Sequence, residues 1–250
     1  MQKHLKKMMK KSVLSPGIKE FFPIREKFEI DRDEDAIKIM PTKKYDHYQI
    51  EYEAIRNSND VNALFMFSQT HPEHVDSLYA VGEFLRLQGN YRDADSLIQR
   101  VIYIYEMAAG YDLQEFIKND VVKKHIVYDT YSTSLFMSLF KFMDILGKKG
   151  CYRSALEYNK LLLKINIDDP TACLLCIDFN SISSKSNEFL IKFVKNFSTY
   201  LRNKESNLYL LPNFTFSTAL AKFSIENDKK TEGELVVQEN NMGNLLDFSE

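Results

Sequence analysis

Tryptophan is absent from this 250-residue sequence, and cysteine, glycine and proline are scarce, with three, eight and six residues. Three cysteines are an odd number and form no disulfide framework, which indicates a reducing, intracellular setting. Few glycines and prolines favour helices, because both residues interrupt them. No apolar run reaches the roughly eighteen residues that a membrane-spanning helix needs, and the N-terminus lacks the apolar core of a secretory signal.

An excess of one sign of charge is also lacking, since the net charge is only −2. This balance argues against a general polyanion binder. The sequence has instead 44% hydrophobic residues, including 18 phenylalanines and 14 tyrosines. This content is ample for a core, and the length predicts one or two domains. We therefore expect a helical protein with an aromatic-rich core and no membrane partner.

The most informative pattern is a helix–turn–helix motif that occurs twice, with a Gly-x-Tyr-x-x-Ala core in each copy. The first copy has small or apolar residues at Leu78, Gly82, Leu85, Gly89, Tyr91, Ala94, Ile98 and Val101. At the same offsets, the second copy has Leu139, Met143, Leu146, Gly150, Tyr152, Ala155, Asn159 and Leu162. Matching sets at matching offsets indicate tetratricopeptide-like helical hairpins, which stack into binding surfaces.

Each position of the core has a physical reason. Glycine in the turn permits a positive φ. We expect the tyrosine to fill the space beneath the turn and the alanine to let the second helix approach the first closely. The two copies are 61 residues apart, from Gly89 to Gly150, whereas a regular array would repeat every ~34 residues. The solenoid is therefore expected to be irregular, with an insertion at 110–130. Such a pattern favours a scaffold over an enzyme.

The predicted fold class is all-α: an irregular tetratricopeptide-like superhelix, or solenoid, with a flexible N-terminal leader and a polar C-terminal tail. The leader is predicted at 1–44, the helical-repeat domain at 45–226 and the tail at 227–250. Within the leader we expect 13–44 to be extended or irregular, with FFPI at 21–24 clipped onto the helical body. Helices are expected at 45–69, 73–88, 91–109, 132–147, 151–165, 170–182, 187–203 and 214–226.

Capping signals support three of these helix starts. Asp60 is the expected N-cap of a helix that begins at VNALFMFSQ. Thr70 and Glu73 have the spacing of a capping box, with Pro72 in the first turn. Asp169 before Pro170 predicts another start.

Groups that could carry chemistry are few, and each has a simpler structural explanation. Cys173 and Cys176 form a CxxC, but a zinc site needs a second pair, so we expect both thiols in the core. His71, His74 and Asp76 could hold a metal or transfer protons, yet they fit a helix start better. Nucleophile, metalloprotease and phosphate-loop motifs are absent. The sequence predicts no catalytic residue, no metal and no cofactor.

Basic residues gather in two places. The N-terminal segment 1–12 carries Lys3, Lys6, Lys7, Lys10 and Lys11, and it is either a solvated arm or an RNA-binding arm. The second group lies near the repeat turns and the insertion, at Arg86, Arg92, Arg100, Lys123, Lys124, Lys148, Lys149 and Arg153. This group is either a solvated face or a rim that contacts RNA or an acidic partner.

Three ordered segments resemble blocks of one protein family. They read SQTHPEHVDSLYAVGEFLRLQGNYRDADSLIQRVIYIYE at 68–106, FMDILGKKGCYRSALEYNKLLLKINIDDPTACLLCID at 142–178 and LPNFTFSTALAKF at 211–223. The family is the transcription-factor-twenty-five-like group, whose fungal members are subunit one of the ribosome quality control complex. Relatives carry a longer charged region before the helices and further helices after the third segment, so this chain is expected to be either a reduced member of the family or an incomplete one.

The resemblance implies a non-catalytic adaptor in ribosome-associated quality control, found in the cytoplasm and also in the nucleus. Its implied partners are the large ribosomal subunit with its ribosomal RNA, a listerin-type E3 ubiquitin ligase, ubiquitin and a valosin-type AAA segregase. The adaptor would promote ubiquitination and extraction of stalled nascent chains. Two alternatives stay open: a nuclear transcriptional repressor of the same family, and a general tetratricopeptide-like scaffold for protein interactions.

Residues expected to bind partners come from the helix starts, the repeat turns and the LPNF segment. They are His74, Asp76, Arg86, Arg92, Lys148, Lys149, Arg153, Asn213 and Phe214. Asn213 could instead satisfy backbone groups in its turn, and Phe214 could be a core residue.

Overall fold

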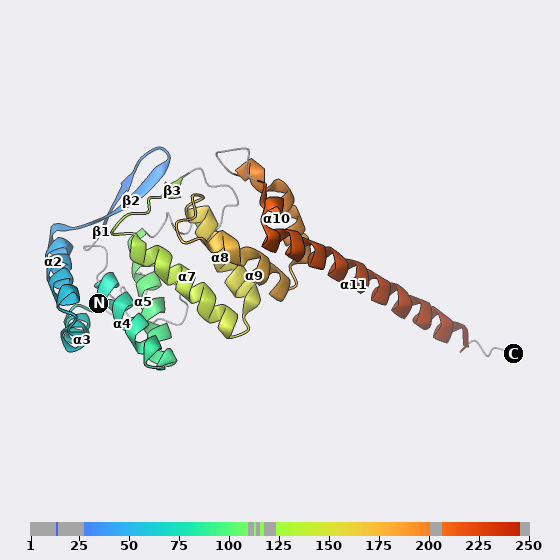
Figure 1. The fold of residues 1–250 in the computed structure, drawn as a ribbon, viewed down its shortest axis with the longest axis horizontal. Coiled ribbons are helices and arrows are strands. Elements are labelled where there is room, and N and C mark those ends of the chain that lie inside the picture. Colours follow the sequence, from blue (N-terminus) through green and yellow to red (C-terminus); the bar gives the residue numbers. More distant parts are fainter. Residues whose placement is uncertain are drawn as a thin grey trace, which may run out of the picture. The chain divides into compact units, whose positions relative to one another are not determined.

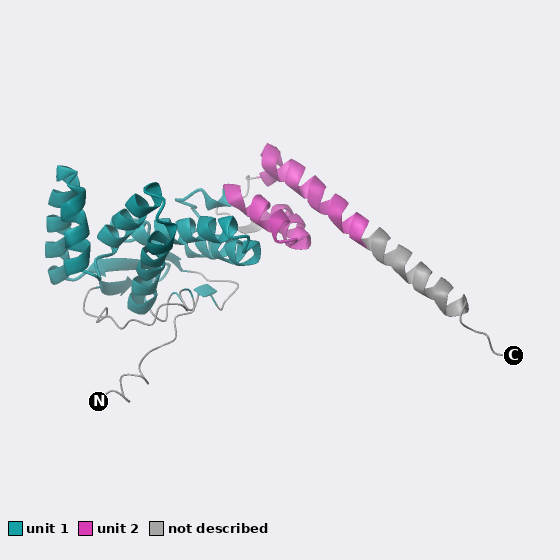
Figure 2. Cartoon of the chain, turned by 90° about the horizontal axis from the view of Figure 1, so that it is seen from below, with its two compact units in different colours: residues 1–174 teal, residues 175–250 magenta. Residues whose placement is uncertain are grey.

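The structure is a computed structural model that describes residues 14, 28–109, 113, 116–117, 124–200 and 207–245. Helices dominate the fold, which confirms the predicted helical solenoid class (Figure 1). The chain forms two compact units, residues 1–174 and residues 175–250 (Figure 2). This division does not coincide with the predicted boundaries after residues 44 and 226. The basic segment 1–12 and the FFPI segment lie outside the described residues.

Unit 1 contains three strands and six described helices. The strands are β1 Phe28–Arg32, β2 Ala36–Pro41 and β3 His125–Ile126; the helices are α2 Lys43–Ser58, α3 Val61–Thr70, α4 Val75–Leu87, α5 Tyr91–Ala109, α7 Thr133–Lys148 and α8 Tyr152–Ile165. Helix α4 packs on α5, α5 on α7, and α7 on α8. Two helical hairpins therefore lie side by side, as the repeated motif predicts (Figure 1).

The small sheet was not predicted: residues 13–44 were expected to be extended or irregular, and the extended segments within 28–41 pair into a β-hairpin. Strands β1 and β2 form an antiparallel hairpin, and β3 pairs in parallel with the start of β2. In β2 the buried Ile37 and Ile39 alternate with the exposed Lys38 and Met40, which is the period of a strand with one buried face. Such a short alternation is easily missed next to proline and charged residues.

Both predicted elbows adopt the same turn. Gly89 and Gly150 have φ values of 80° and 75°, as expected for glycine after a helix end. In the first turn Asn90 N–H donates to the Leu85 carbonyl at 2.9 Å, and in the second Cys151 N–H donates to the Leu146 carbonyl at 2.9 Å. In each turn the glycine N–H also donates to the carbonyl three residues earlier. The two hydrogen bonds together form the Schellman motif in each hairpin.

Small residues bring the helices of a hairpin close together. Ala94 and Ala155 are fully buried. A Cβ atom at Gly82 would lie 3.2 Å from Ile98 Cδ1 of the opposite helix. The predicted role of Tyr91 was wrong, because its side chain is 60% exposed and does not fill the space beneath the turn. In the first hairpin the close approach therefore depends on Gly82 and Ala94, without the tyrosine.

The start of α4 also differs from the prediction. The predicted N-cap Asp60 is confirmed for α3, since its carboxylate accepts the N–H groups of Asn62 and Ala63. However, Thr70 ends α3 instead of capping α4, and the N-cap of α4 is His74. The imidazole accepts the Ser77 N–H at 3.2 Å, as a serine or aspartate cap would.

Leu14, which precedes the hairpin, is anchored to two helices of unit 1. Its N–H donates to Glu106 of α5 at 3.2 Å, and its carbonyl accepts the Tyr158 hydroxyl of α8 at 2.5 Å. Leu14 itself is buried. A residue of the predicted leader thus belongs to the packed body of unit 1.

Near the end of unit 1, Asp169 does not cap an α-helix at Pro170 as expected. It adopts a φ of 49°, and its carboxylate accepts the N–H groups of Cys173 and Leu174, both at 2.8 Å. These bonds hold a 3-10 turn, η2, at Cys173–Cys176. The α-helix begins only afterwards.

Unit 2 contains α9 Ile177–Ser183, α10 Asn187–Tyr200, η3 Leu208–Leu210 and α11 Pro212–Leu245. The turn between α9 and α10 repeats the Schellman geometry: Lys185 has a φ of 58°, and Ser186 N–H donates to the Ser181 carbonyl at 2.8 Å. A third elbow therefore exists without its glycine, and Leu190 stands where the other two have alanine.

Helix α11 is longer than predicted and has two apolar faces. It runs to Leu245, whereas the sequence predicted a polar tail from residue 227. Phe214 and Ala221 are buried within unit 2, while Phe216 and Phe223, two residues further along in each case, are exposed. Two residues turn the helix by roughly 200°, so the exposed aromatic rings lie opposite the buried face.

Candidate interaction surface at the repeat turns

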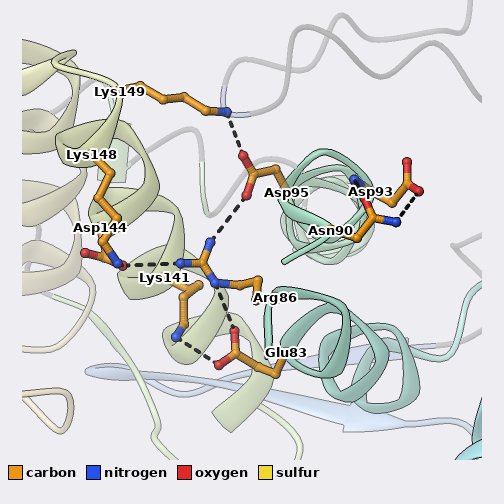
Figure 3. A network of polar contacts seen from close by, with 9 residues as sticks. All are labelled: Glu83, Arg86, Asn90, Asp93, Asp95, Lys141, Asp144, Lys148 and Lys149. Carbon is orange, nitrogen blue, oxygen red and sulfur yellow. Dashed lines mark hydrogen bonds and ion pairs between the residues drawn. The ribbon is translucent and has the colours of Figure 1, made fainter. Parts of the chain in front are cut away.

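Arg86 of α4 is the centre of an ionic network that joins the two hairpins (Figure 3). Its guanidinium lies 3.4 Å from Asp95 of α5 and 3.7 Å from Asp144 of α7. Only 13% of the side chain is exposed, and that of Asp95 is 9% exposed. These charges are largely removed from water, so they stabilise the packing of the hairpins only while all partners stay in place.

Three lysines complete this network from the second hairpin (Figure 3). Lys149 Nζ lies 2.6 Å from Asp95, and Lys148 Nζ lies 2.8 Å from Asp144. Lys141 Nζ lies 2.9 Å from Glu83 of α4. The predicted residues Arg86, Lys148 and Lys149 are thus brought together, but each is paired with a carboxylate of this chain.

Arg92 and Arg153, in contrast, are exposed, and they occupy equivalent positions in the two hairpins. Each is the second residue of the second helix in its hairpin, in α5 and α8. Neither side chain forms an ion pair or hydrogen bond with the residues that the structure describes. A cation in the first turn of a helix is unfavourable by about 0.3–1 kcal/mol, because the N-terminal end of the helix dipole is positive. Stability therefore does not explain these arginines, and they remain available to an anionic partner.

His74 lies in the interior, where it offers no surface to a partner. Its Nε2 faces Gln49 Oε1 of α2 at 3.0 Å, and its ring stacks on that of Tyr45, with centroids 5.0 Å apart. The Tyr45 hydroxyl accepts the Val75 N–H at 3.0 Å. Burial, together with the charge of His71, lowers the pKa of His74 to about 3. The imidazole is therefore neutral and holds α2 against the start of α4.

Asp76 also joins elements of unit 1. The Ser134 hydroxyl of α7 donates to its carboxylate, and Gln49 of α2 is a second hydrogen-bond partner. Desolvation by burial raises the pKa of Asp76, although both hydrogen bonds act in the opposite direction. Asp76 of α4 therefore connects α2 and α7, and its carboxylate is already hydrogen-bonded within the chain. The tyrosine periodicity at 45–52 was the sequence signal for this cluster.

In unit 2 the predicted pair at LPNF separates. Phe214 is fully buried, which agrees with its alternative explanation as a core residue, and Asn213 is half-buried. The predicted lysines of segment 1–12 lie outside the described residues.

The described part of the chain contains no group of three or more His, Cys, Asp or Glu side chains placed to hold a metal ion. Cys173 is buried, as predicted, whereas Cys176 is partly exposed and Cys151 is exposed. The same residues form no helix that is both long and apolar enough to cross a membrane.

Paired helices joined by turns with the same hydrogen bonds define this chain as an α-helical repeat protein. A family model described as "Transcriptional repressor TCF25" matches residues 37–240. This match covers most of the chain, including every described helix except the end of α11, so the chain belongs to that family.

Named relatives agree with this assignment. "Ribosome quality control complex subunit TCF25" of Dictyostelium discoideum is 30% identical over 192 residues, which cover 77% of this chain and 26% of the relative. The human protein of that name is 29% identical over 191 residues, covering 73% and 26%. "Ribosome quality control complex subunit 1" of Schizosaccharomyces pombe is 26% identical over 199 residues, covering 76% and 28%. This chain therefore spans about a quarter of the length of these relatives, and no solved structure matches it.

Proposed function

We propose that this chain is a non-catalytic adaptor of ribosome-associated quality control. The observation that carries this proposal is the similarity of its helical repeats to proteins named as ribosome quality control subunits. In this role it binds the large ribosomal subunit and a listerin-type ubiquitin ligase, promotes ubiquitination of stalled nascent chains, and supports their extraction by a valosin-type AAA segregase. The proposed location is the cytoplasm.

Arg92 and Arg153 are the proposed contacts with ribosomal RNA. They are exposed, occupy equivalent positions in two stacked hairpins, and have no carboxylate partner among the described residues. Arginine pairs well with phosphate oxygens because its planar guanidinium donates two parallel hydrogen bonds. Lys148 and Lys149 are secondary contacts, since they would have to share their charge with Asp144 and Asp95.

A reconstituted ubiquitination reaction tests this function. Purified large subunits that carry a stalled nascent chain are mixed with the ligase, and ubiquitin chain length is measured with and without the adaptor. The double substitution Arg92→Glu and Arg153→Glu should reduce the effect of the adaptor by at least about tenfold, because two phosphate contacts become repulsive. The control is Lys192→Glu with Lys195→Glu, which changes the net charge equally on exposed residues of α10.

If the parent protein changes neither chain length nor yield, the adaptor function is wrong. If both double variants lose activity equally, the effect is one of net charge and the assignment to the repeat turns is wrong.

A second candidate function is transcriptional repression in the nucleus, which the family description "Transcriptional repressor TCF25" favours. It predicts that a tagged chain is concentrated in the nucleus and is absent from fractions that contain large ribosomal subunits. Chromatin fractionation of the same cells distinguishes the two functions.

A further inference from the structure

Strand β1 is an edge strand of the sheet. The strand order is β1-β2-β3, so β1 pairs only with β2, and no described strand covers its other side. The turn of the β1–β2 hairpin extends away from α4 and α5 (Figure 1). An uncovered edge presents backbone N–H and C=O groups that can pair with another extended chain.

The register shows which groups face outward. Asp33 N–H donates to the Ala36 carbonyl at 2.9 Å, which sets the hydrogen-bonding phase of the hairpin. Because bonded and non-bonded pairs alternate along an antiparallel ladder, the Asp31 and Lys38 pair is bonded and the Ile30 and Ile39 pair is not. The N–H and C=O of Ile30 therefore point to the outer side of β1, where the Arg32 guanidinium donates a long hydrogen bond of 3.5 Å to the Ile30 carbonyl, which an added strand would replace.

Most exposed side chains along this edge are acidic, and Arg32 is the one basic residue of β1. Five exposed carboxylates lie on the strand and its turn, at Glu29, Asp31, Asp33, Glu34 and Asp35. None forms an ion pair with a residue that the structure describes. On β1, Glu29 and Asp31 alternate with the buried Phe28 and the half-buried Ile30, so the two carboxylates share the solvent-facing side of the strand.

We propose that the outer edge of β1 binds an extended, lysine- or arginine-rich peptide segment of another protein by strand addition. The Ile30 backbone groups bond to the added strand. Directly opposite side chains on neighbouring strands have Cβ atoms ~4.5–5.5 Å apart, so basic residues at every second position of the peptide come next to Glu29 and Asp31. The turn carboxylates, Asp33 to Asp35, attract a further basic residue.

Charge complementarity decides this occupant. A second copy of the chain, paired β1 to β1, would bring the same carboxylates together, and like charges on paired strands repel. Nucleic acid is disfavoured for the same reason. This inference goes beyond the proposed ribosomal function and does not depend on it.

Fluorescence anisotropy with the labelled peptide Lys-Thr-Lys-Val-Lys-Thr-Lys and the full chain tests this site. The double substitution Glu29→Lys and Asp31→Lys should raise the dissociation constant at least about tenfold, because two attractive cross-strand pairs become repulsive. The matched control is Glu51→Lys with Glu53→Lys, two exposed carboxylates of α2 with the same spacing, and its dissociation constant should stay within about twofold. Circular dichroism confirms that each variant keeps the helical content of the parent.

A second probe separates strand addition from diffuse charge attraction. The same peptide, N-methylated at its three central residues, keeps its charge but cannot donate those backbone hydrogen bonds, so it should bind at least about tenfold more weakly. Equal binding of both peptides, equal affinity of the two double variants, or no binding at about 1 mM peptide would overturn the proposal. A gain in peptide affinity on deletion of residues 1–12 would identify that segment as the occupant and would also overturn it.

Discussion

The buried imidazole of His74 makes the stability of unit 1 depend on pH. Its Nδ1 accepts the Ser77 N–H, and its remaining proton lies on Nε2, facing Gln49 Oε1. A second proton on Nδ1 would oppose that N–H in a cluster of aromatic rings. Burial is the main cause that lowers the pKa of His74 to about 3, with the charge of His71 second. The native state therefore excludes a proton that the unfolded chain accepts.

The direction and size follow from linkage. A depressed pKa in the folded state stabilises the protein above the unfolded pKa of about 6.5, and this contribution is lost as the pH falls toward 3. Between pH 7 and pH 5 the unfolded chain becomes almost fully protonated at this site while the native one does not. The expected loss from His74 is about 2 kcal/mol of unfolding free energy.

Urea unfolding at pH 7 and pH 5, followed by tyrosine fluorescence, measures this loss, because all tyrosines except Tyr200 and Tyr209 belong to unit 1. The variant His74→Gln removes the titrating group and should lose about 2 kcal/mol less than the parent between the two pH values. Asp76, whose pKa is raised by burial, acts in the opposite direction and is present in both proteins. An equal loss in parent and variant would refute the buried, neutral histidine.

Four further substitutions test the elbows and the ionic network by urea unfolding. Ala155→Arg should cost at least about 3 kcal/mol, because a charged side chain cannot fit between the helices of its hairpin; a parent-like midpoint would contradict the close approach. Gly89→Ala should cost about 1 kcal/mol through its φ of 80° alone, since no atom lies within 4 Å of the added Cβ. Lys185→Gly should stabilise unit 2 by about 1 kcal/mol by relieving its φ of 58°, and destabilisation would contradict this. Arg86→Met should cost about 1–3 kcal/mol, because Asp95 loses a partner in a nearly buried position, and 1 M salt should not abolish the difference.

Local repetition explains why the two hairpins were predictable from sequence. Gly89 and Ala94 each determine one geometric property, a positive φ and a close approach, and both reappear as Gly150 and Ala155. The third elbow escaped detection because Lys185 takes the left-handed conformation in place of glycine. The positive φ of Lys185 is imposed by packing, and a lysine in the sequence does not indicate it.

The interaction surface was less predictable, because pairing depends on tertiary contacts. Arg86 and Arg92 are both arginines near the first turn, but only the structure shows that Arg86 is held by Asp144 from the next hairpin while Arg92 is exposed. His74 resembled a surface residue at a helix start and is instead buried by α2. The acidic run at 31–35 lies within the predicted leader, and its place on a sheet edge follows only from pairing with β2.

Sedimentation with large ribosomal subunits tests the proposed function most directly. Lysates in which stalled nascent chains accumulate on large subunits are separated on sucrose gradients at low and moderate salt. The account predicts that the chain co-sediments with large subunits at both salt concentrations, and that Arg92→Glu with Arg153→Glu shifts it toward the top of the gradient while Lys192→Glu with Lys195→Glu does not. Absence of the parent chain from the large-subunit fraction at both salt concentrations would contradict a role as a ribosome quality control adaptor.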